Sequence, residues 1–361
     1  MTAVERLRLG VIGCGEVAQA IHLPTLRELE HLFEVTALYD MSASVLEAVG
    51  AHWSGARRFA DHRQLLAYGG VDAVLIANHS VDHAVTTLDA IAAGKHVLVE
   101  KPMCLNLHEA DRLIAAAETA RCTVQVGFMR RYAPAFIEAV ARVAAWSKSI
   151  TLARVHDLIG MNALLIGSLG AQLARRTDMP PSIAERTRAR MSAAIELAIG
   201  SVLPDRANAY QLLLALGSHD LSAMRELLGP PRSILYARQD HGGRIITAAL
   251  DYGTYVCQLE LGVDTLPRYE TYLQVHSESE VIRVDYDTPY IRHLPAKLQI
   301  TNLHGGAGIA HLTSFPSRRD AFSLQWQAFY ENVRQHRQPK TSLADGRQDL
   351  VLARDLLGQM T

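Results

Sequence analysis

The first third of the chain alternates short β-branched runs with longer stretches whose apolar residues recur at helical spacing. This alternation is typical of βαβ units, in which helices cover both faces of a parallel sheet and the strands read as continuous apolar runs. Strands are predicted at residues 7–12, 35–39, 73–77, 97–99 and 124–126.

Two helices in this part of the chain carry signals at their ends. The stretch 81–93 is apolar at helical spacing and stops at Gly94, a residue type that commonly ends helices. Asn106, with Glu109 three residues later, forms an N-cap signal for a helix ending near Ala120. We therefore expect an open α/β sheet with well-bounded helices.

From residue 150 the pattern changes. Residues 150–155 predict one strand, and 161–176 is amphipathic. Pro180 and Pro181 interrupt this helical region, because proline removes a hydrogen-bond donor, and a second helix is expected over 182–202. A third helix is expected to start at Pro204.

The rest of the chain predicts a second domain. Residues 233–301 alternate apolar and polar positions between turn residues, which is typical of antiparallel strands, and helices are predicted at 322–334 and 346–357. A length of 361 residues also favours two domains. We predict an N-terminal domain over 1–127 and a second over 128–361 with a helical insertion at about 160–203.

Composition excludes several classes of partner. Lys plus Arg number 36 and Asp plus Glu 37, so the net charge is −1, and nucleic acid or an anionic membrane surface is not an expected partner. With 49% hydrophobic and 20% charged residues, the chain is predicted to be globular.

Cysteine spacing and hydropathy bear on compartment and metal. The four cysteines show no CxxC spacing, so neither a disulfide framework nor a zinc site is indicated, and we expect no metal. The apolar stretch near the start is too short for a signal peptide, and no run approaches 18 apolar residues. We expect a cytoplasmic protein without membrane contact.

A dinucleotide-binding motif follows the first predicted strand. Gly13, Gly15 and Ala18 form a GxGxxA turn, which lets a diphosphate approach the backbone at a helix N-terminus. Glu16 and Val17, inside the motif, are candidate cofactor contacts with it. The alternative is a purely structural glycine turn.

Asp40 ends the second predicted strand, where an acidic side chain can accept hydrogen bonds from the adenosine ribose. Its neighbours Met41 and Ser42 include no arginine to receive a 2′-phosphate. We therefore predict NAD rather than NADP, although Ser42 also suits a phosphate contact.

Glu100-Lys101-Pro102 follows the fourth predicted strand, at the edge of an open α/β sheet where ligands bind, and Glu100 and Lys101 are candidate cofactor contacts. Proline forces Lys101 out of helical geometry, with a cis bond as one route. A lysine in that crevice can hydrogen-bond a substrate hydroxyl and share in proton movement. The alternative is a surface lysine at a strand end.

Four segments taken in order, GVIGCGEVA, GKHVLVEKP, VQVGFMRRYAP and GSHDLSAMRELLG, resemble the Gfo/Idh/MocA family of nicotinamide-dependent oxidoreductases. The resemblance covers nearly the whole chain. It implies an α/β fold: a Rossmann domain followed by an α+β domain with a large, mostly antiparallel sheet. It also implies that Lys101 and His219 act at the carbon that is oxidised or reduced, with His219 as general base or acid.

The resemblance suggests further site residues and an assembly. Asn78, His79 and His83 correspond to contacts with the nicotinamide half of the cofactor, with capping or turn roles as the alternative. Arg131, His156, Asp157 and Asn162 are the implied substrate-binding residues; for Arg130 and Arg131 the alternative is a salt bridge. A homo-oligomer, dimer or tetramer, is expected because a second subunit commonly covers the open face of the large sheet.

The chain also departs from its relatives. Ala215 stands where many sugar and inositol dehydrogenases of this kind carry an Asp, four residues before the histidine, and Ser222 replaces a common acidic residue. Support for His219 would then come from Asp157, Asp205 or Asp220.

Three functions are compatible with these residues. The leading hypothesis is an NAD-dependent dehydrogenase acting on a secondary alcohol of a cyclic polyol, sugar or glycoside. A second is a redox-neutral enzyme that keeps NAD bound and cleaves a glycosidic bond through a transient keto-sugar. A third, a non-catalytic sugar or NAD sensor, is disfavoured by the presence of both Lys101 and His219.

The helical insertion is rich in basic residues. We expect it to be a lid over the substrate or an oligomer contact, with a solvated charged face as the alternative. Its arginines are Arg175, Arg176, Arg186, Arg188 and Arg190.

Overall fold

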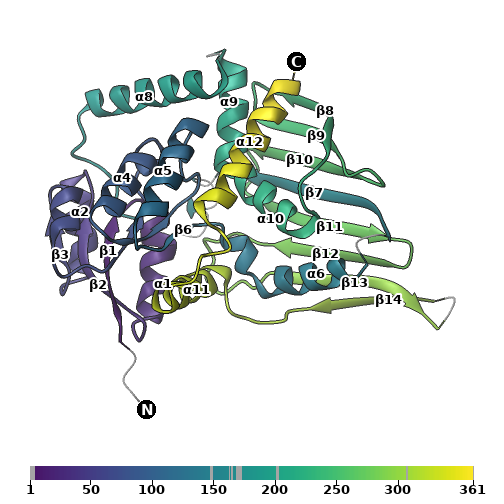
Figure 1. Ribbon diagram of the computed structural model, residues 1–361, viewed down its shortest axis with the longest axis horizontal. Coiled ribbons are helices and arrows are strands. Elements are labelled where there is room, and N and C mark those ends of the chain that lie inside the picture. The colour runs from purple at the N-terminus through teal and green to yellow at the C-terminus, as the bar shows by residue number, and fades with distance from the viewer. Residues whose placement is uncertain are drawn as a thin grey trace. The chain divides into compact units, whose positions relative to one another are not determined.

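The chain packs into two compact units (Figure 1). The computed structural model describes residues 5–146, 149–161, 163, 166–167, 173–200, 203–305 and 308–360. Unit 1 comprises Met1–Gly127, Ala171–Gly200 and Gln325–Leu350, and unit 2 comprises Phe128–Gly170, Ser201–Leu324 and Val351–Thr361. The predicted division after residue 127 therefore omits two later segments that pack with the N-terminal part.

Unit 1 is built on a six-stranded parallel sheet in the order β3-β2-β1-β4-β5-β6. Five of its strands were predicted, and β3 was missed because it has only three residues, two of them exposed arginines. The strands are β1 Leu7–Ile12, β2 Phe33–Tyr39, β3 Arg57–Phe59, β4 Ala73–Ile76, β5 His96–Val99 and β6 Val124–Val126.

Helices cross over between these strands. Asn106 caps α5 as predicted, since its Oδ1 accepts from the Glu109 backbone N–H at 2.9 Å. Gly94, at φ +70°, follows the end of α4. The helices are a π-helical turn at Ala18–His22, α1 Leu23–Glu28, α2 Ala43–Ala51, α3 His62–Ala67, α4 Ser80–Ala92 and α5 Leu107–Thr119.

The core of unit 1 joins the sheet to a helix from much later in the chain. Helix α11, Ala321–Gln335, contributes Trp326, Phe329 and Val333 to the core that contains Leu9 and Leu75. The Trp326 ring meets the edge of Phe33 at a centroid distance of 5.1 Å. Apolar burial of this kind is the main stabilising contribution, which explains why 325–350 packs with unit 1.

Unit 2 is built on an eight-stranded sheet in the order β14-β13-β12-β11-β7-β10-β9-β8, whose strands are labelled in Figure 1. All neighbouring strands pair antiparallel except β7 and β10, which are parallel. The strands are β7 Ile150–Gly160, β8 Ser233–Asp240, β9 Ile245–Asp251, β10 Val256–Asp264, β11 Tyr269–Ser277, β12 Glu280–Tyr286, β13 Lys297–His304 and β14 Gly308–Ser314.

The helices of unit 2 include one continuous helical run with a π-helical turn in its middle, at Leu213–Gly217. Such turns are frequent near functional sites. The run consists of α9 Pro204–Leu212, this turn and α10 Ser218–Leu228. The other helical segments are a 3-10 turn at Met129–Tyr132 and α6 Pro134–Ala145, and α12, Leu343–Gln359, ends in this unit.

The helical insertion differs from its prediction. Helix α8, Pro181–Ile199, forms where a second helix was expected, but residues 173–177 are not helical, so the predicted helix over 161–176 is wrong at its end. The segment 171–200 packs in unit 1. Arg190 of α8 donates to Asp82 of α4 at 2.6 Å.

The fold class is as predicted: a Rossmann-type parallel sheet with helices, together with a large and mostly antiparallel sheet. Among the helices that the structure describes, none combines the length and the apolar character needed to cross a bilayer.

Candidate active site

The glycine turn of unit 1 has the geometry that a dinucleotide requires. Gly13 has φ +97°, and a Cβ there would lie 2.4 Å from the Asn78 backbone nitrogen, so only glycine fits. A Cβ at Gly15 would meet only Arg176 Nη2, at 3.9 Å. The space over Gly15 is thus open to a diphosphate, and the residues present fit the cofactor.

The rest of the motif leads into the first helical turn. Glu16 is exposed, Val17 precedes the π-helical turn, and Ala18 is fully buried against the sheet. Burial and the nearby Asp40 carboxylate raise the pKa of the Cys14 thiol to about 12, so this thiol stays protonated.

Asp40 lies at the carboxyl end of β2 and is only 4% exposed. Its Oδ2 accepts from the Cys14 backbone N–H at 2.8 Å, and its Oδ1 accepts from the Ser42 N–H at 2.9 Å. Asp40 therefore ties the glycine turn to the loop after β2. Its contact with an adenosine ribose stays a prediction.

Glu100 and Lys101 lie at the carboxyl end of β5, and the Lys101–Pro102 peptide bond is cis. His22 Nε2 lies 2.9 Å from Glu100 Oε1, and the Lys101 backbone N–H donates to Glu100 Oε2 at 3.1 Å. Trp326 Nε1 donates to His22 Nδ1 at 3.0 Å, so the ring proton of neutral His22 sits on Nε2 and is donated to Glu100.

This chain of hydrogen bonds fixes the charge of Glu100. Burial raises the pKa of Glu100, but the hydrogen bond from His22 and the charge of Lys101 outweigh burial, and the net pKa lies below its ordinary value. The ionised carboxylate then holds the backbone of Lys101 in place.

We expect His22→Ala to lower the free energy of unfolding by about 3 kcal/mol, because it removes the side-chain donor to Oε1 of the buried Glu100 carboxylate. The control is His62→Ala, which removes a pair with Asp89 whose side chains are 21% and 27% exposed, and it is expected to cost about 1 kcal/mol or less. Urea unfolding measures both variants. Equal losses would show that the His22 pair contributes no more than a surface pair.

Asn78 and His79, in the loop after β4, are held by local contacts. Asn78 Nδ2 donates to Thr86 at 2.9 Å, whereas Asn78 Oδ1 is buried with no hydrogen-bond partner among the described residues. His79 caps α4 by accepting from the Val81 N–H at 3.3 Å. The open acceptor on Asn78 suits an amide or hydroxyl donor of a cofactor.

His83 is 3% exposed, and its ring nitrogens face the carbonyls of Pro102, at 2.7 Å, and Asn78, at 3.1 Å. Burial lowers the pKa of His83 despite these acceptors, which favours the neutral ring. His83 thus joins the loop after β4 to the turn that carries Lys101, and a direct cofactor contact stays a prediction.

In unit 2, His219 lies in the first turn of α10, directly after the π-helical turn that contains Ala215. His219 is only 7% exposed. Ser222, one turn later, donates to the His219 carbonyl at 3.2 Å and so satisfies its own hydroxyl within the helix.

Three buried charged side chains meet in unit 2. Arg130 Nη1 lies 2.6 Å from Asp220 Oδ1 and 2.8 Å from Asp157 Oδ2, and all three side chains are at most 1% exposed. Arg130 Nη2 also donates to the Tyr269 hydroxyl at 2.9 Å, and Thr271 donates to Asp157 Oδ1 at 2.5 Å. Two carboxylates thus share one guanidinium.

A single positive charge cannot neutralise both carboxylates. Burial raises the pKa of Asp220 well above its ordinary value; Arg130 opposes this rise and the Asp157 carboxylate adds to it. At pH values between its ordinary pKa and its raised pKa, Asp220 therefore holds a proton in the folded protein that the unfolded chain releases. Asp157 and Asp220, both named as possible supports for His219, are bound to Arg130.

This proton predicts a pH dependence. Between the ordinary carboxyl pKa of about 3.9 and the raised value, the folded state binds more protons than the unfolded state, so stability falls as pH rises. We expect Asp220→Asn, which has no proton to release, to lose this part of the slope. The control is the exposed Asp355→Asn. Urea unfolding across pH measures the slopes, and parallel curves for wild type and Asp220→Asn would contradict the assignment.

The other predicted substrate residues do not come together. Arg131 Nε donates to Glu226 of α10 at 2.5 Å, the salt-bridge alternative. His156 stacks on Tyr272 at 4.8 Å and pairs with Glu260 at 2.6 Å. Neighbouring residues of a strand point to opposite faces, so His156 and Asp157 do not line one pocket. Asn162 lies outside the described residues.

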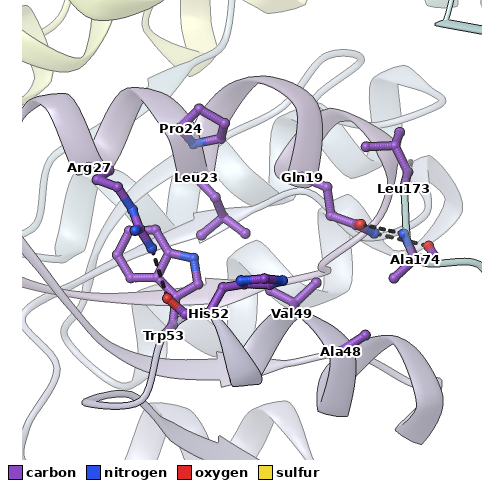
Figure 2. Close-up of a pocket in the computed structure, with 10 residues that line it drawn as sticks. All are labelled: Gln19, Leu23, Pro24, Arg27, Ala48, Val49, His52, Trp53, Leu173 and Ala174. Atoms are coloured by element: carbon purple, nitrogen blue, oxygen red, sulfur yellow. Dashed lines mark hydrogen bonds between the residues drawn. The ribbon is translucent and has the colours of Figure 1, made fainter. Parts of the chain in front are cut away.

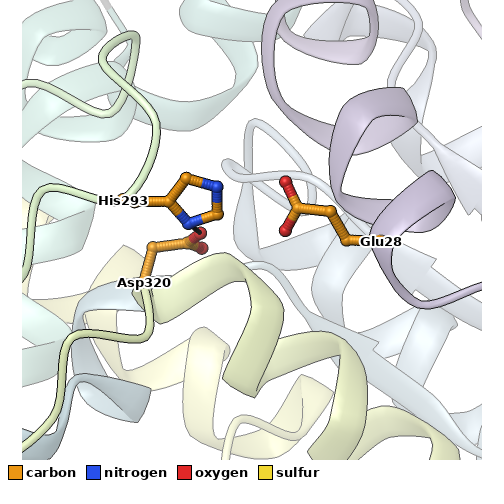
Figure 3. Close-up of side chains that lie close together, drawn as sticks. All are labelled: Glu28, His293 and Asp320. Atoms are coloured by element: carbon orange, nitrogen blue, oxygen red, sulfur yellow. Dashed lines mark ion pairs between the residues drawn. The ribbon is translucent and has the colours of Figure 1, made fainter.

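Asp205 and Asp320 are acidic residues of unit 2 outside the Arg130 cluster. Asp205 lies in the first turn of α9, close to Gly242. Asp320 caps α11 by accepting from the Ser323 N–H and lies 3.7 Å from His293 Nδ1 (Figure 3). Arg292 Nη2 lies 3.0 Å from the same Asp320 carboxylate, and its positive charge opposes a metal cation there.

The parallel sheet of unit 1 and its glycine turn define a Rossmann fold of the dinucleotide-binding type, and unit 2 adds a second, largely antiparallel sheet. Residues 7–128 match a family model described as oxidoreductase family, NAD-binding Rossmann fold. The matching model is that of the Gfo/Idh/MocA oxidoreductase family, and the match covers the N-terminal part of the chain.

Curated relatives match over part of their length. The chain is 36% identical over 178 residues to an inositol 2-dehydrogenase of Paracoccus denitrificans, covering 48% of this chain and 53% of that protein. It is 35% identical over 226 residues to inositol 2-dehydrogenase 2 of Saccharopolyspora erythraea, covering 62% and 54%. The matches thus span about half the length of these two relatives.

A solved structure matches the whole fold. KijD10, a 3-ketoreductase from Actinomadura kijaniata in complex with NADP and TDP-benzene, superposes with a TM-score of 0.74 and covers 99% of this chain and 98% of its own, at 20% identity. An oxidoreductase from Thermotoga maritima gives a TM-score of 0.72 at 18% identity, covering 98% of this chain and 97% of its own. At these identities the likeness shows the fold alone.

Sequence reasoning missed several residues of unit 1 that surround the predicted site. His22 and Trp326 position Glu100, but they stand 304 residues apart and neither belongs to a motif. No local motif marks Asp178, and in the sequence Arg176 is one member of the basic cluster of the insertion. The one available signal was the buried acidic residue at a strand end, which requires a partner somewhere in the fold.

Proposed function

We propose that this protein is an NAD-dependent dehydrogenase acting on a secondary alcohol of a cyclic polyol, sugar or glycoside. The observation that carries the proposal is the placement of Lys101 at the carboxyl end of β5, held through Glu100 by His22, in the unit that also contains the glycine turn. In open α/β folds ligands bind at this edge of the sheet.

The two catalytic residues have separate tasks. Lys101 orients and polarises the reacting oxygen through its ammonium group, and His219 takes the hydroxyl proton during oxidation and returns it during reduction. When bound, the nicotinamide supplies the hydride chemistry. Asp220, the residue after His219 in α10, pairs with the buried Arg130, which also pairs with Asp157. These ion pairs hold the first turn of α10 and thereby position His219.

NAD is the proposed cofactor. Asp40 at the end of β2 and the absence of an arginine in the following loop support NAD over NADP. The inositol 2-dehydrogenases among the relatives support a polyol, and a neutral hydroxyl-rich substrate suits a chain of net charge −1.

The test is a panel of inositols, aldoses and glycosides incubated with NAD, with NADH formation followed by absorbance. Steady turnover with at least one polyol or sugar is expected. Consumption of a glycoside without net NADH would replace the proposal by the redox-neutral cleavage of a glycosidic bond. Binding of NAD with no reaction of either kind would leave a sensor.

We also propose a homo-oligomer. The outer strands of the large sheet expose apolar side chains, among them Leu303 and Ile309 at 64% and 68% exposure, and an uncovered strand edge favours association. Sedimentation velocity is expected to give a dimer or tetramer, and a monomer at micromolar concentration would contradict this.

A further inference from the structure

A short segment of the insertion lies over the dinucleotide motif of unit 1. We call residues 173–178 the strap. The Gln19 amide donates to the Ala174 carbonyl at 3.1 Å and accepts from the Ala174 N–H at 2.8 Å, as Figure 2 shows. Gln19 also donates to the Cys14 carbonyl at 2.8 Å. One side chain therefore ties the strap to the glycine turn.

Further along the strap, Arg176 reaches the same turn. Its Nη2 lies 3.9 Å from the position of a Cβ on Gly15, and its Nε lies 3.8 Å from Asp40 Oδ1. Among the residues that the structure describes, and leaving aside the chain neighbours of Gly15, Arg176 Nη2 is the only atom within 4 Å of that Cβ position. A guanidinium there faces the place where a bound diphosphate carries its negative charge.

Asp178 occupies the donors that follow Asp40. Its Oδ1 accepts from the hydroxyls of Ser42, at 2.5 Å, and Ser44, at 2.9 Å, and its Oδ2 accepts from the Ser44 backbone N–H at 3.1 Å. These hydrogen bonds hold the pKa of Asp178 below its ordinary value. The donors lie at the N-terminus of α2, where an anion is stabilised.

These donors have the chemistry that a ribose 2′-phosphate needs. They come directly after the acidic residue predicted to meet the ribose, and hydroxyls with a helix N-terminal N–H are the usual partners of a phosphate. A carboxylate of the chain itself already satisfies them. A 2′-phosphate would have to displace Asp178 or lie against its negative charge, whereas a free 2′-hydroxyl would not.

We infer that the strap is a cofactor-selecting clasp, in which Asp178 takes the place of a 2′-phosphate and excludes NADP while Arg176 pairs with the diphosphate of NAD. The inference rests on the proposed NAD-dependent function and adds two residues from the insertion to it. Selection against NADP then depends on Asp178 as well as on the loop after β2.

The experiment is calorimetric titration of the full chain with NAD and with NADP, which needs no substrate. Wild type is expected to bind NAD at least tenfold more tightly than NADP. In Asp178→Ser the affinity for NADP is expected to rise at least tenfold and that for NAD to change less than threefold. The control is Glu185→Gln, which removes an exposed negative charge of α8 and is expected to change neither affinity.

A second pair of variants tests the guanidinium. Arg176→Gln is expected to weaken NAD and NADP alike, by about tenfold, whereas Arg175→Gln, an exposed neighbour, is expected to leave both unchanged.

The outcomes separate the two proposals. If NAD binds but the ratio of the two affinities is the same in wild type, Asp178→Ser and Glu185→Gln, Asp178 is only structural and the clasp is overturned. A wild type that prefers NADP overturns it as well. If neither dinucleotide binds, the proposed function fails together with the clasp.

Discussion

Replacing Lys101 by Met is expected to lower kcat for the polyol or sugar substrate by about 10²–10⁴-fold, the usual contribution of a positioned proton-transfer group. Methionine keeps much of the length of lysine but removes the ammonium group that would polarise the reacting oxygen. The backbone hydrogen bond from residue 101 to Glu100 does not depend on the side chain, so the turn should keep its shape. Affinity for NAD, measured by titration, is expected to change little.

The matched control is Lys95→Met. Lys95 directly precedes the first residue of β5, and its Nζ donates to the Val71 carbonyl at 2.8 Å. This variant is expected to retain its kcat. His219→Ala should lose activity to a similar extent as Lys101→Met, and the double variant should be little worse than either, because residues that act on one proton transfer are not additive. Full turnover in Lys101→Met would remove Lys101 from the mechanism.

Replacing Arg130 by Met is expected to lower the free energy of unfolding by about 3–5 kcal/mol, the cost of breaking a buried charge cluster by removing one partner. The change leaves the buried Asp157 carboxylate, and the Asp220 carboxyl group beside it, without the guanidinium that both contact, and it also removes the donor to the Tyr269 hydroxyl. Urea unfolding at neutral pH gives the measurement.

The cause of that loss can be checked by rescue. Adding Asp157→Asn and Asp220→Asn to Arg130→Met removes both ionisable carboxyl groups, and with them the unpaired negative charge, and is expected to restore part of the stability. The control is Arg142→Met, whose partner Glu138 is on the same helix and whose side chain is 41% exposed, so a loss of about 0.5 kcal/mol is expected. No rescue by the double Asn change would mean that lost packing, not unpaired charge, destabilises the variant.

Local pattern was sufficient for most of unit 1. Both faces of a parallel sheet are covered, so its inner strands are short apolar runs that the sequence pattern predicts. This holds for β1, β2, β4, β5 and β6. Strand β3 does not, since an edge strand with two exposed arginines buries too little to leave a pattern. Asn106 and Gly94 mark helix ends because caps depend on residue types within a few positions.

The helical insertion shows where local pattern fails. Its apolar spacing predicted helix through Arg176, yet residues 173–177 are not helical, because the hydrogen bonds from Gln19 to Ala174 and from Ser44 to Asp178 satisfy the backbone and side chains in another way. Such contacts join residues more than 130 positions apart, and no window of the sequence contains both partners.

What the sequence by itself determined is the chemistry available: a glycine turn after a strand, an acidic residue after the next one, and a lysine before a proline at a strand end. These are local because each depends on backbone geometry within a few residues. Only the tertiary structure decided which partners set their charge. Burial makes the charge of Glu100 and Asp220 depend on the groups that lie against them. His22, Trp326 and Arg130, and the exposed Asp178 at the N-terminus of α2, reach their partners through folding alone.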